Sequence, residues 1–299
     1  MRATAFAPGS IGNVGPGFDV LGLAVDGIGD RVTVELTQDA PRVDDVTGID
    51  ADLVPRDSDR NCAAIAAAAV LRGSGWNAIV TIHKGLPFAG GMGGSAASSV
   101  AGAFAAALAL NRNTDIIAAA LEGEAAVAGC HLDNIAPSVV GGLALSRSID
   151  PIDVIKLPVA ANWWVALVTP RVRIQTKEAR ALLPNETGRA EWIQQMANTT
   201  ALAHAFAVGD GALLRRSLDD RYAEPRRASL IPHFYDVKNA ALENGALGCS
   251  ISGSGPTLFA IAENEAAARV CATVMQMAFA EVESTAHVGA IAKEGVRRA

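Results

Sequence analysis

The sequence predicts an α+β protein built from two domains. Half of its 299 residues are apolar, which is enough for a substantial core at a length where one core usually divides into two. Strand-like and helix-like segments follow one another without the regular alternation of a parallel α/β sheet, so layered α+β architecture is favoured. The composition changes around Pro151 and Pro158. We therefore expect one domain over residues 1–159 and a second over residues 160–299, with contacts between them.

The first half contains three strand candidates and three helix candidates. β-Branched residues cluster in residues 31–36 and 79–83, which is typical of strands. The charged segment between them, residues 39–60, contains two prolines and predicts an excursion away from the core. Helices are expected over residues 62–72, 95–110 and 114–128, the last preceded by capping residues, and a further strand over residues 141–146.

The second half shows the same mixture of elements. The expected strands are residues 163–169, 257–262 and 283–288. The expected helices are residues 176–183, 190–208, 234–244 and 265–280. No internal repeat or low-complexity tract interrupts the chain.

Charge and hydropathy exclude several classes of protein. The formal net charge is −6 and no basic run precedes the last few residues, so a nucleic-acid partner is not expected. The longest apolar stretch, residues 100–110, is shorter than the roughly 20 residues that cross a bilayer, and the N-terminus lacks a secretory pattern. The four cysteines are scattered, which favours reduced, buried thiols. We expect a cytoplasmic protein without a membrane partner.

The most informative segment is residues 87–99, PFAGGMGGSAASS. Four glycines within five residues permit positive φ and let backbone N–H groups converge on one point. The helix expected to begin near Ser95 adds its free N–H groups and its positive dipole end. A polyphosphate fits such a site, and the alternative is an ordinary turn capped by serine. No Gly-Lys-Ser/Thr follows, so the segment is not a P-loop, and its match to a dinucleotide fingerprint is weak.

This segment resembles the phosphate loop of the GHMP kinases, P-x-x-x-G-L-G-S-S-A-A. The phosphate contacts that the resemblance implies are Pro87, Gly90, Gly91, Met92, Gly93, Gly94, Ser95 and Ala96. Gly94 replaces the usual first serine, which removes one phosphate hydrogen bond without unmaking the loop. Residues 7–19 (APGSIGNVGPGFD) and 252–257 (SGSGPT) resemble the first and third motifs of the same family.

The family resemblance implies a fold and a site. GHMP kinases have two α+β domains, the first with a left-handed βαβ crossover and the second ferredoxin-like, and ATP and substrate meet between them. Homodimers are common in the family. The resemblance also implies that Asn61 touches the adenine end and that Ser95 and Glu124 hold Mg²⁺, with Glu122 as the alternative to Glu124.

Ser10 stands where mevalonate-kinase-like members carry lysine, whereas the N-x-G-x-G-F-D pattern of residues 13–19 and residues 131–137 (HLDNIAP) resemble the branch of the family that phosphorylates homoserine. A carboxylate suits the substrate's ammonium group, and guanidinium forks suit its carboxylate. Arg226 is interpreted as a surface charge beside the ligand Arg227. The substrate contacts implied are Asn13, Asp19, His131, Asn134, Thr176, Arg180 and Arg227.

The expected reaction is ATP-dependent phosphorylation of the L-homoserine hydroxyl, in threonine biosynthesis. Asn134, Glu124 and Ser95 are the expected catalytic residues. Asn134 orients the hydroxyl, and Asp133 is the alternative candidate for a general base. Three other functions stay open: a GHMP kinase for another small alcohol, a catalytically silent binding protein of the same fold, and, more remotely, a nicotinamide-dependent enzyme.

Overall fold

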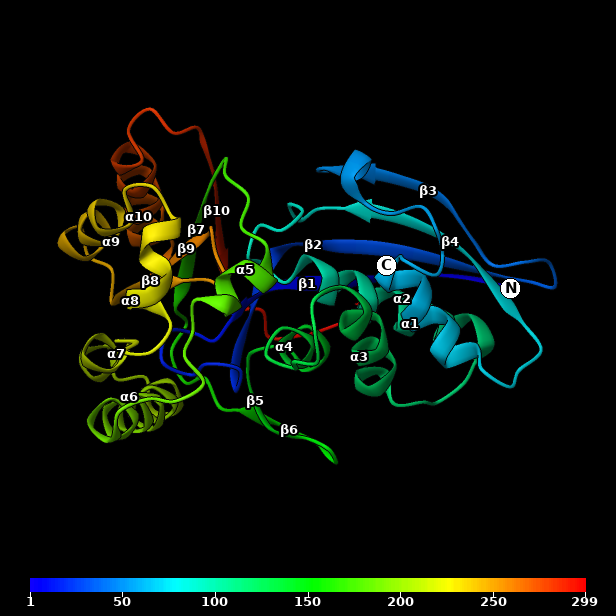
Figure 1. The fold of residues 1–299 in the computed structure, drawn as a ribbon, viewed down its shortest axis with the longest axis horizontal. Coiled ribbons are helices and arrows are strands. Elements are labelled where there is room, and N and C mark those ends of the chain that lie inside the picture. The colour runs from blue at the N-terminus through cyan, green and yellow to red at the C-terminus, as the bar shows by residue number, and fades with distance from the viewer.

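The computed structural model of the protein describes residues 1–299 and contains two β-sheets (Figure 1). The larger sheet has the strand order β11-β1-β2-β4-β3, with β5 paired to β2 and β6 paired to β5, and the smaller sheet has the order β10-β7-β9-β8. The strands are β1 (Arg2–Gly12), β2 (Leu21–Thr37), β3 (Arg42–Gly48), β4 (Asn77–Lys84), β5 (Leu143–Ile149), β6 (Ile152–Leu157), β7 (Trp164–Pro170), β8 (Gly248–Ile251), β9 (Leu258–Ala262), β10 (Ser284–Ala290) and β11 (Arg297–Arg298).

Helices cover both sheets, and none of them is both long and apolar enough to span a bilayer. They are α1 (Cys62–Leu71), α2 (Gly94–Leu110), α3 (Ile116–Val127), α4 (Ile135–Val140), α5 (Thr176–Ala181), α6 (Arg189–Val208), α7 (Gly211–Ser217), α8 (Glu224–Arg227), α9 (Phe234–Glu243) and α10 (Glu265–Ala278), with short 3₁₀ turns η1 (Ala51–Leu53) and η2 (Ala228–Leu230). Helix α2 packs directly on β1 and β2, while α9 and α10 pack on the smaller sheet.

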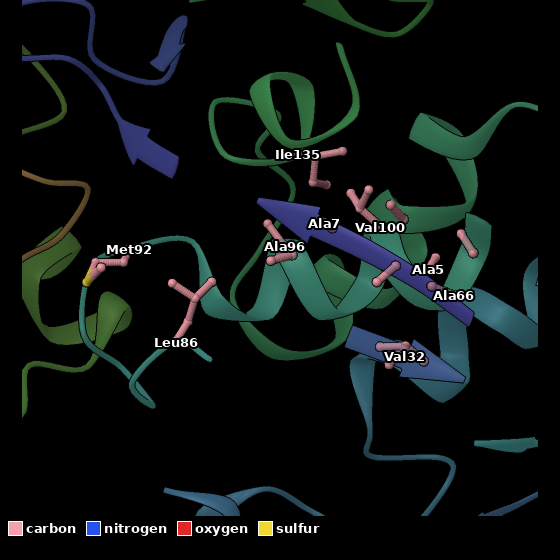
Figure 2. Packing of buried hydrophobic residues seen from close by; sticks show 14 of the residues in the cluster. Ala5, Ala7, Val32, Ala66, Leu86, Met92, Ala96, Val100 and Ile135 are labelled. Atoms are coloured by element: carbon pink, nitrogen blue, oxygen red, sulfur yellow. The ribbon is translucent and has the colours of Figure 1, made fainter. Parts of the chain in front are cut away.

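Small side chains let the helices around α2 approach one another closely. A Cβ atom added to Gly102 would lie 2.4 Å from the carbonyl oxygen of Ala63, and one added to Gly123 would lie 2.4 Å from that of Cys62. Figure 2 shows Ala96 and Val100 of α2 beside the β1 strand. The alanine-rich composition is therefore explained by close packing of helix on helix and helix on sheet.

The smaller sheet is buried on both faces, and this joins the two halves of the protein. Val165 and Leu167 of β7 belong to the same apolar cluster as the larger sheet, whereas Ala166 and Val168 belong to a second cluster under α9 and α10. Alternate residues of a strand point to opposite faces. The contacts expected between the two domains are thus part of a continuous core.

Most of the expected elements are confirmed. The strands predicted at residues 31–36 and 79–83 lie within β2 and β4, and Asp115 caps α3 by accepting a hydrogen bond from the N–H of Ala118 at 3.0 Å. The helices predicted at residues 62–72 and 95–110 are α1 and α2 within one residue at each end.

The expected excursion over residues 39–60 is wrong for its first part. Strand β3 pairs in parallel with β4 at the edge of the larger sheet, and its residues Val43 and Val46 are buried. A shift in register between Val43 and Asp45 breaks the simple alternation of apolar and polar residues. The β3–α1–β4 segment is a βαβ unit, and its left-handed crossover stays a prediction.

Several elements were not predicted, above all β1, a strand that contains Pro8 and Gly9. It pairs with β2 on one side and with β11 on the other, so the end of the chain returns to the larger sheet. Strands β6 and β8 and helices α4, α7 and α8 were also missed. The boundary proposed between residues 159 and 160 falls between β6 and β7, which belong to different sheets, and it stays a prediction.

Candidate active site

The three glycine-rich segments meet although they are far apart in the sequence. The Ser252 hydroxyl donates a hydrogen bond to the carbonyl oxygen of Gly91 at 2.6 Å. The N–H of Gly253 donates to the carbonyl oxygen of Gly12 at 3.1 Å. Residues near the two ends of the chain are thereby joined to the loop before α2.

A cleft of about 840 Å³ opens at this junction and is lined by residues from both halves of the chain. The predicted site residues that line it are Asn13, Asp19, Asn61, Pro87, Gly90, Gly91, Gly93, Gly94, Ser95, Glu124, His131, Asn134, Thr176, Arg180 and Arg227. Met92 and Ala96 have buried side chains behind the wall, so any phosphate contact from them comes from the backbone.

The loop before α2 has the conformation that its glycines predict. Gly91 and Gly93 have φ angles of 77° and 66°, in the left-handed region that glycine adopts at little cost. A Cβ atom on Gly91 would lie 2.6 Å from the carbonyl oxygen of Ser252. Gly93 precedes α2 without a side-chain cap, so the alternative of a serine-capped turn is wrong. The first-turn N–H groups of α2 are available to an anion.

A buried ion pair that was not predicted from the sequence supports this loop. The Lys84 ammonium pairs with Asp30 and donates to the Ser98 hydroxyl at 3.0 Å and to the carbonyl oxygen of Gly94 at 3.1 Å. Lys84 is only 4% exposed. A single lysine at the end of a strand usually lies in solvent, so no sequence pattern indicated that it anchors the start of α2.

The geometry distinguishes the two glutamates that were candidates for a metal ligand. Glu124 accepts a hydrogen bond from the Ser95 hydroxyl at 3.0 Å, and its other oxygen, Oε2, is buried without a partner. Burial raises the pKa of Glu124 to about 7. Glu122 instead forms an ion pair with Arg72 at 2.6 Å on the outside of the protein.

An unpaired carboxylate oxygen beside a hydroxyl fits Mg²⁺, which prefers oxygen ligands and is usually bound by one or two carboxylates together with phosphates and water. The protein contains no cluster of three or more His, Cys, Asp or Glu side chains arranged around a common point. A cation beside Ser95 and Glu124 therefore also requires oxygen atoms from a bound phosphate.

Asn134 lies beside the loop, next to Gly93, and Ser10 orients it. The Ser10 hydroxyl donates to Asn134 Oδ1 at 2.9 Å, which leaves the amide nitrogen as the free donor. Gly93 faces the same pair, because a Cβ atom there would lie 2.2 Å from Ser10 Oγ. The neighbouring Asp133 is buried, and burial, with a smaller contribution from the charge of Asp19, raises the pKa of Asp133 to about 7.

A group of charged side chains occupies the other end of the cleft. Arg180 donates to both carboxylate oxygens of Asp19, at 2.9 Å and 2.8 Å. This bidentate bond raises the pKa of Arg180, whose Nε is buried without a partner.

Arg227 is 3% exposed and has no carboxylate partner. Its guanidinium donates to the carbonyl oxygens of Ala179 at 3.2 Å and Gly253 at 3.0 Å. Burial, and then the charge of Arg180, lower the pKa of Arg227. Arg226 points elsewhere and pairs with Glu191 at 3.0 Å, as expected for a residue outside the site.

Asn13 and Asn61 are tied within the protein at both ends of their side chains. Asn13 accepts a hydrogen bond from the N–H of Asp19 at 2.9 Å and donates to the carbonyl oxygen of Gly253 at 3.0 Å. Asn61 caps α1 and donates to the carbonyl oxygen of Pro55 at 2.8 Å. Both residues line the cleft, and both hold its loops in place.

The remaining predicted residues, Thr176 and His131, line the cleft near the charged group. Thr176 begins α5, and its hydroxyl is 3.4 Å from that of Ser254. Burial, followed by the charge of Arg180, lowers the pKa of His131, which favours the neutral ring. Phe88 and Val127 also line the cleft and are partly exposed. This apolar part of the cleft was not predicted from the sequence.

The comparisons with known proteins agree with this architecture. The family model of the GHMP kinases N terminal domain matches residues 61–142, and that of the GHMP kinases C terminal domain matches residues 202–280. A homoserine kinase from Pyrococcus abyssi is 42% identical, with 88% of this chain and 89% of the relative covered. A homoserine kinase from Arabidopsis thaliana is 38% identical, with 96% and 81% covered. The crystal structure of a homoserine kinase from Cytophaga hutchinsonii matches with a TM-score of 0.95 and 38% identity, over 100% of this chain and 97% of that one.

The family models and the full-length relatives identify a small-molecule kinase with this two-sheet fold. The chain belongs to the GHMP kinase family. The full-length relatives named above are all homoserine kinases.

Proposed function

We propose that the protein transfers the γ-phosphoryl group of ATP to the hydroxyl of L-homoserine, a step of threonine biosynthesis. The observation that carries this proposal is the buried, uncompensated cation of Arg227 beside the Asp19–Arg180 pair, in the same cleft as a loop suited to phosphate. An amino-acid substrate supplies the carboxylate that Arg227 lacks, and it brings an ammonium group to the Asp19 carboxylate.

The charges select for a zwitterion. Removing one partner of a buried charge pair is costly because the other charge stays uncompensated. The carboxylate of the substrate compensates the charges of Arg227 and Arg180. The ammonium group of the substrate contacts the Asp19 carboxylate. A neutral sugar would leave Arg227 buried without an anion, so we place galactose and similar alcohols outside the substrate range.

The loop and the start of α2 bind the phosphates of ATP. The residues that we assign to this role are Pro87, Gly90, Gly91, Met92, Gly93, Gly94, Ser95 and Ala96. Ser95 and Glu124 would hold Mg²⁺, which would neutralise charge on the phosphates. Asn61, with the apolar wall near Phe88, marks the adenine end.

Asn134 orients the substrate hydroxyl through its free amide donor, and Ser10 keeps it in place. An asparagine cannot accept a proton, and phosphoryl transfer depends mainly on positioning and charge stabilisation. We therefore propose that the hydroxyl proton passes to the γ-phosphate or to solvent. Turnover lost in Asp133→Asn, with substrate affinity and folding retained, would instead establish Asp133 as the base.

A panel of alcohols tests the reaction. ADP release is measured with L-homoserine, L-threonine, L-serine, mevalonate and galactose. L-Homoserine should have the highest kcat/KM by at least tenfold, which corresponds to about 1.4 kcal/mol. Equal or better turnover of mevalonate or galactose would contradict the proposal, and binding of ATP and homoserine without ADP release would indicate a silent binding protein.

Two adjacent arginines provide a matched pair of variants. Arg227→Met should raise the KM for L-homoserine by more than about 30-fold, since a charge-assisted contact to a carboxylate is worth 2 kcal/mol or more. Arg226→Met, whose side chain pairs with Glu191 outside the cleft, should change it less than about threefold. We further propose that the enzyme is a cytoplasmic homodimer. Light scattering measures the molecular mass in solution and so tests the dimer.

A further inference from the structure

One aromatic ring lies against both arginines of the charged end of the cleft. The guanidinium carbons of Arg180 and Arg227 are each 5.4 Å from the centroid of the Phe18 ring. Phe18 also lines the cleft. The face of an aromatic ring is electronegative and attracts cations, most strongly where water is excluded.

The two guanidinium groups need such a partner because their charges repel. The charge of Arg180 is one of the causes that lower the pKa of Arg227. Asp19 is bonded to Arg180 through both of its oxygens, so Arg227 is left with two carbonyl oxygens and the ring. The Phe18 ring lies against both cations and so offsets part of this repulsion.

The ring itself is held in place by neighbours outside the cleft. Tyr222 packs edge to face against Phe18, with centroids 5.2 Å apart and planes at 72°. The Tyr222 hydroxyl donates to the carbonyl oxygen of Pro184 at 2.8 Å. Arg226 lies over the other ring, 5.3 Å from the Tyr222 centroid. Phe18 is therefore part of a rigid aromatic pair.

We infer that Phe18 is a positioning residue that keeps Arg180 and Arg227 together as one carboxylate-binding fork before substrate arrives. The inference rests on the proposed function, and it adds the group that arranges the two arginines. Holding a binding group in its bound geometry lowers the ordering cost of association. The effect should thus fall on the KM of substrates that carry a carboxylate.

The test compares Phe18→Leu and Phe18→Tyr with a control that loses the same kind of contact elsewhere. Phe6 lies under Arg31 at 5.3 Å and Arg297 at 4.5 Å, where β1 pairs with β2 and β11, and it does not line the cleft. Phe6→Leu therefore removes an aromatic ring from two arginines without touching the site. The unfolding temperature of each variant is measured first.

The two substrates are L-homoserine and L-homoserinol, in which a CH₂OH group replaces the carboxylate. For Phe18→Leu, the KM of L-homoserine should rise about tenfold, from the loss of two cation–π contacts. Its kcat, and the KM of L-homoserinol, should change less than about twofold. Phe18→Tyr, which retains a ring face, should restore the KM of L-homoserine, and Phe6→Leu should leave it unchanged.

Three results with the variants, and one with the wild type, would overturn the inference. An unchanged KM for L-homoserine in folded Phe18→Leu would show that the ring does not arrange the arginines. An equal rise for both substrates would indicate a general structural role, and a folded Phe18→Tyr that behaves like Phe18→Leu would exclude the ring face as the cause. A wild-type protein that neither binds nor phosphorylates L-homoserine would refute the proposed function, and with it this role of Phe18.

Discussion

Glu124→Gln should make the ligand-free protein more stable while it abolishes most of its activity. Burial raises the pKa of Glu124 from its ordinary value of 4.5 to about 7. The folded protein therefore binds this proton more tightly than the unfolded chain does. The corresponding stability is fully present below pH 4.5 and is lost as the pH rises through about 7.

The size of the effect follows from the pKa of this one group. Each pKa unit is worth about 1.4 kcal/mol, so the rise to about 7 corresponds to roughly 3 kcal/mol of stability lost between pH 4.5 and pH 8. Glutamine has a similar shape and no charge to desolvate, so Glu124→Gln should lack this loss. Its kcat with Mg²⁺ and ATP should fall by more than about 100-fold, because a metal ion contributes several kcal/mol to the transition state.

Urea unfolding at pH 5 and pH 8, without metal or nucleotide, measures the difference. The wild type should lose stability between these two pH values, and Glu124→Gln should lose less by roughly 2–3 kcal/mol. Glu122→Gln is the matched control on the same helix, since Glu122 pairs with Arg72 in solvent, and its pH dependence should equal that of the wild type. The reasoning would be refuted if Glu124→Gln and the wild type had the same pH dependence.

Three further variants test the loop and its support. Gly94→Ser restores a hydroxyl at the start of α2. It should lower the KM for ATP about three- to tenfold, which is the effect of one hydrogen bond. Steady-state kinetics at varied ATP measure this, and an unchanged KM would show that the position does not face phosphate. Gly91 has φ at 77°, and an added Cβ would lie 2.6 Å from the Ser252 carbonyl oxygen. Gly91→Ala should therefore cost more than about 1–2 kcal/mol of stability and raise the KM for ATP. A urea unfolding midpoint equal to that of the wild type would contradict this. Lys84→Met leaves Asp30 buried without its cation and should cost about 3–5 kcal/mol; a cost below about 1 kcal/mol would show that the pair does not support the fold.

Features that depend on local chain geometry could be predicted from the sequence. The loop over residues 87–99 requires positive φ, and glycine supplies it wherever the loop lies in the fold. Its position before an alanine-rich segment predicted the start of α2, which the structure places at Gly94. The charged residues of the proposed substrate site were also predictable, because Asp19, Arg180 and Arg227 occur in recognisable motifs.

Features that depend on distant neighbours were not predictable. Strand β3 has two adjacent aspartates, and only its pairing with β4 shows that Val43 and Val46 are buried. Lys84 lies at the end of a strand, and its burial depends on Asp30, which is 54 residues earlier in the chain.

The sequence by itself determined the family resemblance, the glycine-rich loop and the charged residues proposed to bind an amino acid, because those properties belong to short segments. The tertiary structure decided which of two glutamates on α3 faces the cleft, since two residues along a helix point in different directions. It also decided that one ring, Phe18, lies against both arginines. Burial and contact between segments more than 100 residues apart arise only when the chain has folded.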